Sequence, residues 1–309
     1  MDQKFYYHKL GTKNSLAEEW LEQGKSPIGK HAIAIFWGNI TKNDIAKRKL
    51  TIRSKQQAYD FHEAGLKKNH NKTIVILIFN EKIWFVKPTG GMQQRTFKVE
   101  RKNKRKITEI VKLIPVEIVK SIKISKIPPI LAGITANAYV GRGTFREITN
   151  WGNIKAIYTV LGKKLPKEHL ENPDSTKLLE CLGSVELETL VAKIFEANGC
   201  FVPAYRGGNL KDVDLFVHNY QKNSININGL EIKRNEAKTI QIKGKKVIRK
   251  PENVDYFIGY GAEDMKNCFD SEWIIKSIAE SKSDHLKEWF KLSLDWLPNN
   301  FSKNYSILK

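Results

Sequence analysis

Cysteine is scarce in this sequence, with only Cys181, Cys200 and Cys268 among 309 residues. Three cysteines so far apart exclude a disulfide framework and a cysteine-based zinc site, and neither a Cys-x-x-Cys nor a His-x-x-x-His pair occurs. The first residues lack the apolar core of a signal peptide, and no apolar run reaches the length of a membrane span. A glycine-rich phosphate loop of the P-loop type is also missing, which argues against ATP-driven translocation. We therefore expect a cytoplasmic protein without a membrane partner.

Acidic residues are too few to balance the basic ones. Lys and Arg number 53 against 33 Asp and Glu, which gives a formal net charge of +20 at pH 7. An excess of this size indicates an anionic partner, usually nucleic acid or an anionic membrane. The alternative is that an AT-rich genome encodes many lysines. We expect nucleic acid as the partner. The 41% of hydrophobic residues can bury a sizeable core.

Hydrophobic periodicity predicts an α/β protein of two domains. In residues 1–150 short β-branched runs dominate, and the clearest is a hairpin of Thr73–Phe79 and Ile83–Val86 around a polar turn. Separate strands are expected at 107–119 and 122–127. These runs predict a β-rich, barrel-like N-terminal domain. Residues 151–175 read as a helix and a linker, because Pro166 and Pro173 lie among charged residues.

Residues 176–309 alternate between the two periodicities. Helices are expected over 185–198, 272–279 and 286–294, and strands at 215–217, 230–232 and 256–260. This order predicts an α/β domain around a central mixed sheet.

A basic stretch between residues 95 and 106 is a candidate for contact with phosphate. The residues that we expect to make this contact are Arg101, Lys102 and Arg105. The alternative is a solvated, flexible connection between strands.

Two acids and one amine near the middle of the second domain carry the strongest chemical signal. Asp214 opens one short apolar run, and Glu231 and Lys233 close the next as a Glu-x-Lys triplet. If the two runs are neighbouring strands, these side chains meet, because side chains alternate along a strand. Carboxylate oxygens suit Mg²⁺, with Mn²⁺ as a substitute, and a bound ion with a nearby lysine can activate water against a phosphodiester. We expect Asp214 and Glu231 to bind the metal and Lys233 to orient the water. A lone Asp before a strand is otherwise a turn residue, and Glu-x-Lys is otherwise a solvated face.

A third acid comes from the preceding helix. Its apolar residues recur at helical spacing and predict a buried stripe. Glu188 borders this stripe, whereas Glu186 lies on a more polar side, so we choose Glu188 as the acid that reaches the site.

These segments resemble the core of PD-(D/E)XK nucleases, and most of all Mrr-type restriction endonucleases. The matching residues are Glu188–Gly199, Asp212-Val213-Asp214 and Glu231-Ile232-Lys233. Mrr-type members often carry Gly where Asp212 stands, and many have Gln where this chain has Glu231. The resemblance covers the chain from about Thr176 and implies an endodeoxyribonuclease of the restriction or antiviral defence type, with double-stranded DNA as its partner. It also implies that Asp214, Glu231, Lys233 and Glu188 form the catalytic set.

The first half is similar to PUA/EVE-like modules. The carrying segments are Glu19-Trp20-Leu21 with Gly24, the run 32–37 that ends at Gly38, the hairpin 74–86 and Thr144–Ile148. The resemblance implies a reader of modified or flipped bases, held in an aromatic pocket. The candidate walls are Trp37, Trp84 and Tyr139, with Arg142 on phosphate. The alternative is that these aromatic residues form the barrel core.

Two further expectations complete the hypothesis. Cutting both strands with one site per chain calls for a homodimer. The competing interpretations are a nucleic-acid-binding protein without catalysis and a nuclease that acts in repair or on a small-molecule trigger.

Overall fold

The structure is a computed structural model, and it describes residues 3–11, 14–36, 53–100, 106–135, 144–164, 174–203, 213–244, 253–260 and 267–297. The protein is mixed α/β, and its chain divides into two compact units. The first unit comprises Met1–Ile127 and Ile134–Thr149, and the second comprises Pro128–Gly133 and Asn150–Lys309.

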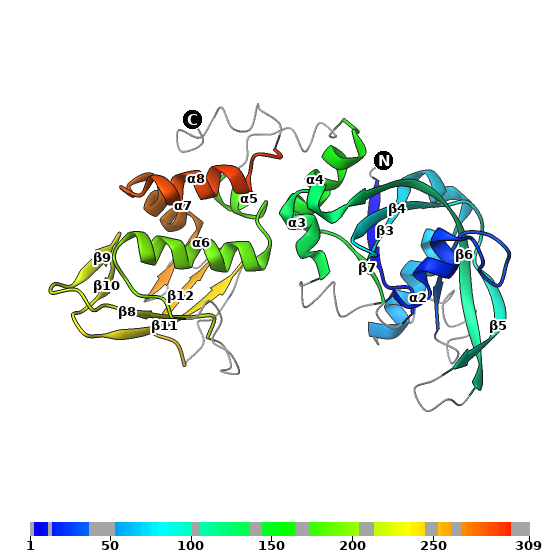
Figure 1. Ribbon diagram of the computed structural model, residues 1–309, viewed down its shortest axis with the longest axis horizontal. Helices are drawn as coiled ribbons and strands as arrows, with labels where there is room; N and C mark the ends of the chain where they lie inside the picture. The colour runs from blue at the N-terminus through cyan, green and yellow to red at the C-terminus, as the bar shows by residue number, and fades with distance from the viewer. Residues whose placement is uncertain are drawn as a thin grey trace. The chain divides into compact units, whose positions relative to one another are not determined.

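The first unit is built on one curled, mixed sheet (Figure 1). Its strands follow the order β2-β6-β4-β3-β1-β7, with β5 also paired to β6. Only β1 and β3 run parallel among the pairs described. The strands are β1 (Lys4–His8), β2 (Ala32–Ile35), β3 (Thr73–Phe79), β4 (Lys82–Pro88), β5 (Gln93–Glu100), β6 (Lys106–Lys123) and β7 (Phe145–Glu147).

The long strand β6 causes the sheet to curl. Its first part pairs with β5 and β2, and its last part pairs with β4. The register with β4 shifts between Phe85 and Val86, a bulge of the kind that increases strand twist. The predicted hairpin of β3 and β4 is confirmed. The strand expected at 107–119 forms as part of β6, which continues without a break to Lys123. The separate strand expected at 122–127 is wrong, because Ile124–Lys126 form a short 3-10 helix, η4.

Helices close the ends of this sheet. The run around Trp20 forms a π-helix, η2 (Glu18–Glu22), whose Trp20 and Leu21 are buried in the core. The helix α2 (Arg53–Ala64) is followed directly by the 3-10 helix η3 (Lys67–Lys72), which leads into β3.

The second unit contains a four-stranded sheet and a separate hairpin in its described part. The sheet order is β13-β12-β11-β8, in which β8 runs antiparallel to β11 and the other pairs are parallel. The strands are β8 (Leu215–His218), β9 (Ile225–Ile227), β10 (Leu230–Ile232), β11 (Ala237–Lys243), β12 (Tyr256–Gly259) and β13 (Cys268–Phe269). The hairpin consists of β9 and β10.

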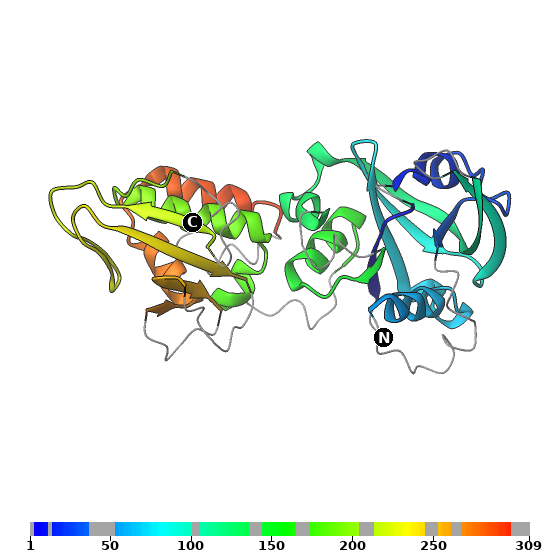
Figure 2. The ribbon, with the colours of Figure 1, turned by 90° about the horizontal axis from the view of Figure 1, so that it is seen from below.

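Helices cover one face of this sheet. Figure 1 shows α6 along the strands, and in Figure 2 the strands lie in front of the helices. The predicted stripe on α6 is confirmed, since Leu187, Leu190, Val191, Ile194 and Phe195 are all buried. The helices of this unit are α3 (Pro129–Ala132), α4 (Trp151–Leu161), α5 (Ser175–Leu179), α6 (Ser184–Ala197), α7 (Ser271–Ala279) and α8 (Asp284–Ser293). The 3-10 helix η5 (Gly133–Thr135) follows α3, where the chain passes back into the first unit.

Burial alternates along β8, so one face of the strand packs in the core and the other is partly exposed. Leu215 and Val217 are fully buried, and with Ile240 of β11 they pack in the same core as α6. Phe216 and His218 are half-buried and alternate with them. Among the residues described, no helix is long and apolar enough to cross a membrane.

Candidate active site

The candidate active site lies where β8 begins beside β11. Asp214 immediately precedes β8, and its backbone N–H donates to the carbonyl oxygen of Ile240 over 2.9 Å. Its carboxylate Oδ2 accepts from the backbone N–H of Ile242 at 2.7 Å and from Nζ of Lys243 at 3.1 Å. The side chains of Asp214 and Lys243 are 21% and 34% exposed. The pair is therefore partly shielded, yet within reach of a ligand from solvent.

A glutamine completes this arrangement. In the register of β8 and β11, Leu215 lies opposite Ile240, so the antiparallel direction sets Asp214 opposite Gln241. Gln241 and Lys243 share one face of β11 because side chains alternate along the strand. Gln241 is 3% exposed. The structure thus brings a carboxylate, an amide and an amine together as Asp214, Gln241 and Lys243.

The strand that carries two of these residues is not among the predicted ones. The run Ala237–Lys243 alternates polar residues with Ile240 and Ile242, which is a regular strand signal. Its Gln-x-Lys triplet has the same spacing as Glu-x-Lys. This alternation is the signal that could have found the strand, and it is longer than the run at 230–232.

Glu231 and Lys233 do not meet Asp214 in the way that the sequence predicted. Their strand β10 pairs with β9, whereas β8 pairs with β11. The side chain of Glu231 is exposed, and its backbone carbonyl accepts from the Tyr256 hydroxyl at 2.6 Å. Lys233 is exposed as well, and its backbone N–H donates to Glu236 Oε2. The expectation that β8 and β10 are neighbouring strands is wrong.

An Asn-Gly turn explains this pairing. Asn228 and Gly229 have φ values of 49° and 91°, as a tight two-residue hairpin turn requires. The turn places Leu230 opposite Ile227 and so commits β10 to β9. Ile227, Leu230 and Ile232 then enter the core, which leaves Glu231 on the outer side. A local turn therefore outcompetes the longer-range pairing of β10 with β8.

The helix acids lie on the first turns of α6. Glu188 is half-buried. Its neighbour Leu187 is buried, and its Cδ2 would lie 3.4 Å from a Cβ built on Gly244, the residue after Lys243. This contact brings the first part of α6 close to the end of β11 that carries Lys243. Glu186 instead folds back against Gly183 at the start of the helix.

The oxygen-bearing side chains of Asp214 and Gln241 suit a hard cation that takes few protein ligands. Among the described residues, no three His, Cys, Asp or Glu side chains group closely enough to hold a metal. Mg²⁺ commonly takes only one or two carboxylates and keeps several waters. Both contacts of Asp214 use Oδ2, and no described residue donates to Oδ1. Asp214 Oδ1 and the side chain of Gln241, which the strand register sets beside Asp214, are the oxygen-bearing groups that such an ion would use.

Trp84, expected as a wall of a base pocket, belongs to the core of the first unit. It is 4% exposed, and its ring stacks on Phe79 with centroids 5.0 Å apart and planes 7° apart. Trp84 is therefore a core residue, as the alternative interpretation of these aromatic residues expected. The other residues predicted to bind DNA or a base lie outside the described residues: Trp37, Arg101, Lys102, Arg105, Tyr139 and Arg142.

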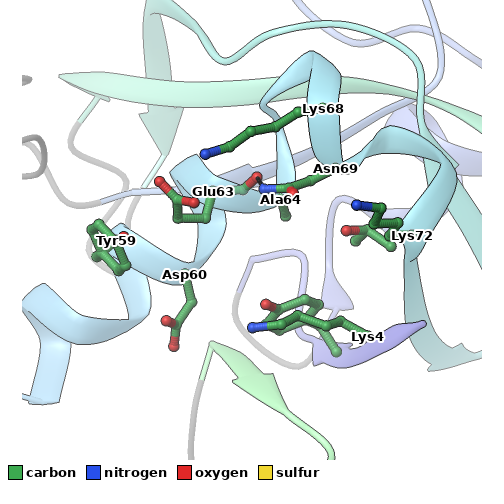
Figure 3. Close-up of a pocket in the computed structure, with 10 residues that line it drawn as sticks. Lys4, Tyr59, Asp60, Glu63, Ala64, Lys68, Asn69 and Lys72 are labelled. Atoms are coloured by element: carbon green, nitrogen blue, oxygen red, sulfur yellow. Dashed lines mark hydrogen bonds between the residues drawn. The ribbon is translucent and has the colours of Figure 1, made fainter. Parts of the chain in front are cut away.

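The first unit does contain a pocket, of about 280 Å³, between α2, η3 and the first residues of β1 and β3. Figure 3 shows Asp60 and Glu63 on α2, with Lys68 and Lys72 on the segment that follows. Burial raises the pKa of Asp60, and the nearby charges of Glu147 and Glu63 add to this rise. The pocket is thus lined by groups of both charges.

Comparison with known proteins supplies no relative. No protein-family model matches the chain, and neither a curated protein nor a solved structure matches it.

Proposed function

We propose that the chain is a Mg²⁺-dependent DNA endonuclease that hydrolyses phosphodiester bonds in its second unit. The observation that carries the proposal is the pairing of β8 with β11, which sets Asp214 beside Gln241 and Lys243. Its basic composition, with a net charge of +20, also fits a polyanionic substrate. This triplet replaces Asp214, Glu231 and Lys233 in the sequence-based hypothesis.

The resemblance to Mrr-type nucleases supports the same assignment. Many members of that group have Gln in the second position of the triplet, and Gln241 meets that pattern where Glu231 departs from it. With Glu188 on the preceding helix, the chain order is helix acid, strand Asp, strand Gln-x-Lys. The proposed fold of the second unit is that of restriction endonucleases.

Each residue has a role that its chemistry allows. A bound divalent ion would neutralise charge on the scissile phosphate and lower the pKa of a water. Asp214 and Gln241 would hold that ion through oxygen atoms. Lys243 keeps the carboxylate of Asp214 in place, and its ammonium group can donate to a phosphate oxygen or orient the attacking water. Glu188 would accept a hydrogen bond from a ligand water at the helix side.

The biological role, the oligomeric state and the function of the first unit are proposed in keeping with this candidate active site. We propose a restriction or defence role with a homodimer that cuts both strands, and a first unit of PUA/EVE-like type that contacts DNA, including DNA with modified bases.

Plasmid cleavage tests the catalytic triplet. The wild-type protein should nick or linearise plasmid DNA with Mg²⁺ and should not do so with EDTA. Asp214→Ala and Lys243→Ala should abolish cleavage while DNA binding persists. Glu231→Ala and Lys233→Ala are the matched controls, because they remove the same two side-chain types from the hairpin and should leave cleavage nearly intact.

The controls also separate the possible errors. Loss of cleavage in Lys233→Ala but not in Lys243→Ala would return the site to the hairpin. Cleavage that survives both Asp214→Ala and Lys243→Ala would refute the proposal. Salt-sensitive DNA binding with no metal-dependent cleavage in the wild type would favour a nucleic-acid-binding protein without catalysis.

A further inference from the structure

Three aromatic rings cluster at the far end of β8 from Asp214. Phe201 forms a two-way backbone bridge with His218, with hydrogen bonds of 2.8 and 2.9 Å. The His218 ring stacks on Tyr220, with centroids 5.6 Å apart and planes 11° apart, and Phe201 lies 6.0 Å from Tyr220. We call Phe201, His218 and Tyr220 the aromatic platform.

The aromatic platform is unusually open to solvent. Phe201 is 53% exposed and Tyr220 is 66% exposed, and among the residues whose exposure is described they are the only aromatic ones in the set of exposed large hydrophobic residues. More than half of each of these two residues therefore remains in contact with solvent. Contiguous apolar surface that stays exposed is a feature of ligand-binding sites.

Buried Asn219 holds the aromatic platform in place. Its Oδ1 accepts from the backbone N–H of Gln221 at 2.8 Å, and its Nδ2 donates to the carbonyl oxygens of Asn223 and Ile232, both at 2.9 Å. Its backbone also bonds to Asn235 and Glu236. The loop after β8 is therefore tied to the turn after β10, and the exposed rings are pre-organised.

Basic side chains flank the aromatic platform. Lys222 is exposed two residues beyond Tyr220, and the exposed Arg234 lies in the turn that Asn219 anchors. The one acid in that turn, Glu236, is paired with Lys238 at 2.7 Å. Aromatic rings among uncompensated cations are the composition that binds single-stranded nucleic acid, because rings stack on bases and cations contact phosphates.

The aromatic platform also lies in line with the candidate active site. Phe216 and His218 are alternate residues of β8, and Asp214 continues the same alternation directly before the strand, with its backbone N–H bonded to Ile240 of β11. Their side chains therefore lie on the same face of the sheet. At the rise of a strand, His218 is about 13 Å from Asp214, a distance that a few nucleotides can span.

We propose that the aromatic platform binds unpaired bases, so that the DNA is held through a single-stranded stretch beside the cut. The placement beside the cut rests on the proposed function, whereas the binding itself does not. A duplex hides its base faces in the stack, so it cannot use these rings. A protein partner would need a larger continuous apolar patch than this cluster, which is bordered by Gln221, Lys222 and Asn223.

Equilibrium binding in EDTA tests this proposal without any need for cleavage. The probes are a labelled oligothymidylate and a blunt duplex, and the readout is fluorescence anisotropy. Tyr220→Ala and Phe201→Ala should each weaken binding of the single strand by about 5- to 100-fold, as expected for the loss of base stacking. Duplex affinity should change by less than about 2-fold, because it depends on phosphate contacts.

Two control variants make the result decisive. Tyr220→Phe keeps the ring and should retain the affinity for the single strand. Leu292→Ala removes a large hydrophobic residue that is 61% exposed on α8 and should leave both affinities unchanged.

Failure of this proposal is distinguishable from failure of the nuclease assignment. The wild type binding no single strand, or Tyr220→Ala losing affinity equally for both probes, would overturn the aromatic platform. If instead Asp214→Ala binds the single strand normally and the wild type never cleaves DNA, the aromatic platform stands and the nuclease assignment falls.

Discussion

Replacement of Asn219 gives a sharp test of how the second unit is held together. This side chain is 0% exposed and makes three hydrogen bonds to backbone groups, two in the loop after β8 and one at the last residue of β10. Asn219→Asp is nearly isosteric and keeps the acceptor for Gln221. It removes both donor bonds, however, and sets a carboxylate oxygen against the carbonyl oxygens of Asn223 and Ile232.

The magnitude follows from these contacts. A net contribution of about 0.5–1.5 kcal/mol per hydrogen bond gives about 1–3 kcal/mol for the two lost bonds. The Ile232 bond is buried, and an unpaired buried carbonyl adds to the cost. The buried carboxylate adds a further cost to the lost hydrogen bonds. We therefore expect Asn219→Asp to lower the free energy of unfolding by about 3 kcal/mol at neutral pH.

Urea denaturation followed by circular dichroism measures this loss. With a slope of about 2–3 kcal/mol per molar urea, the midpoint should fall by roughly 1 M. Asn223→Ala is the control, because the exposed Asn223 contributes only its backbone carbonyl to this network, and it should change the midpoint little. An Asn219→Asp variant as stable as the wild type would refute the claim that Asn219 donates to both Asn223 and Ile232.

Two further predictions concern the stability contributed by His8 in the first unit and by Gly229 in the second. Burial lowers the pKa of His8 from 6.5 to about 4, against the opposing effect of its hydrogen bond to the Thr144 carbonyl. The unfolded chain therefore binds the extra proton first, and stability should fall by up to about 3 kcal/mol as the pH drops from about 6.5 to about 4. Urea denaturation at several pH values should show this dependence of the free energy of unfolding on pH in the wild type and a weaker one in His8→Gln. An equal dependence in both proteins would contradict the lowered pKa of His8. Gly229 has φ +91°, and a Cβ there would meet nothing within 4 Å, so Gly229→Ala should cost about 1–2 kcal/mol through backbone strain alone. Gly229→Asn should cost less in the same urea assay, because Asn tolerates positive φ, and an alanine variant of unchanged stability would mean that the turn has another conformation.

The sequence determined those parts of the fold that depend on local periodicity. The five apolar residues at helical spacing on α6 are buried as predicted, and the hairpin of β3 and β4 forms around its polar turn. In both cases neighbours along the chain decide which face is buried. Asp214 could be picked out for the same reason, because it directly precedes an apolar strand.

Only the tertiary structure decided which strand lies beside Asp214. Glu231-x-Lys233 and Gln241-x-Lys243 have the same spacing, and each follows an alternating pattern, so neither pattern identifies the partner of β8. The Asn228-Gly229 turn commits β10 to β9, and β11 is then the strand that pairs with β8. The sequence also does not tell whether Trp84 faces a pocket or the core, because an aromatic residue in a strand can do either. In the structure its ring packs against Phe79 in the core. Strand pairing and ring burial depend on contacts between segments far apart in the chain, which local sequence patterns do not specify.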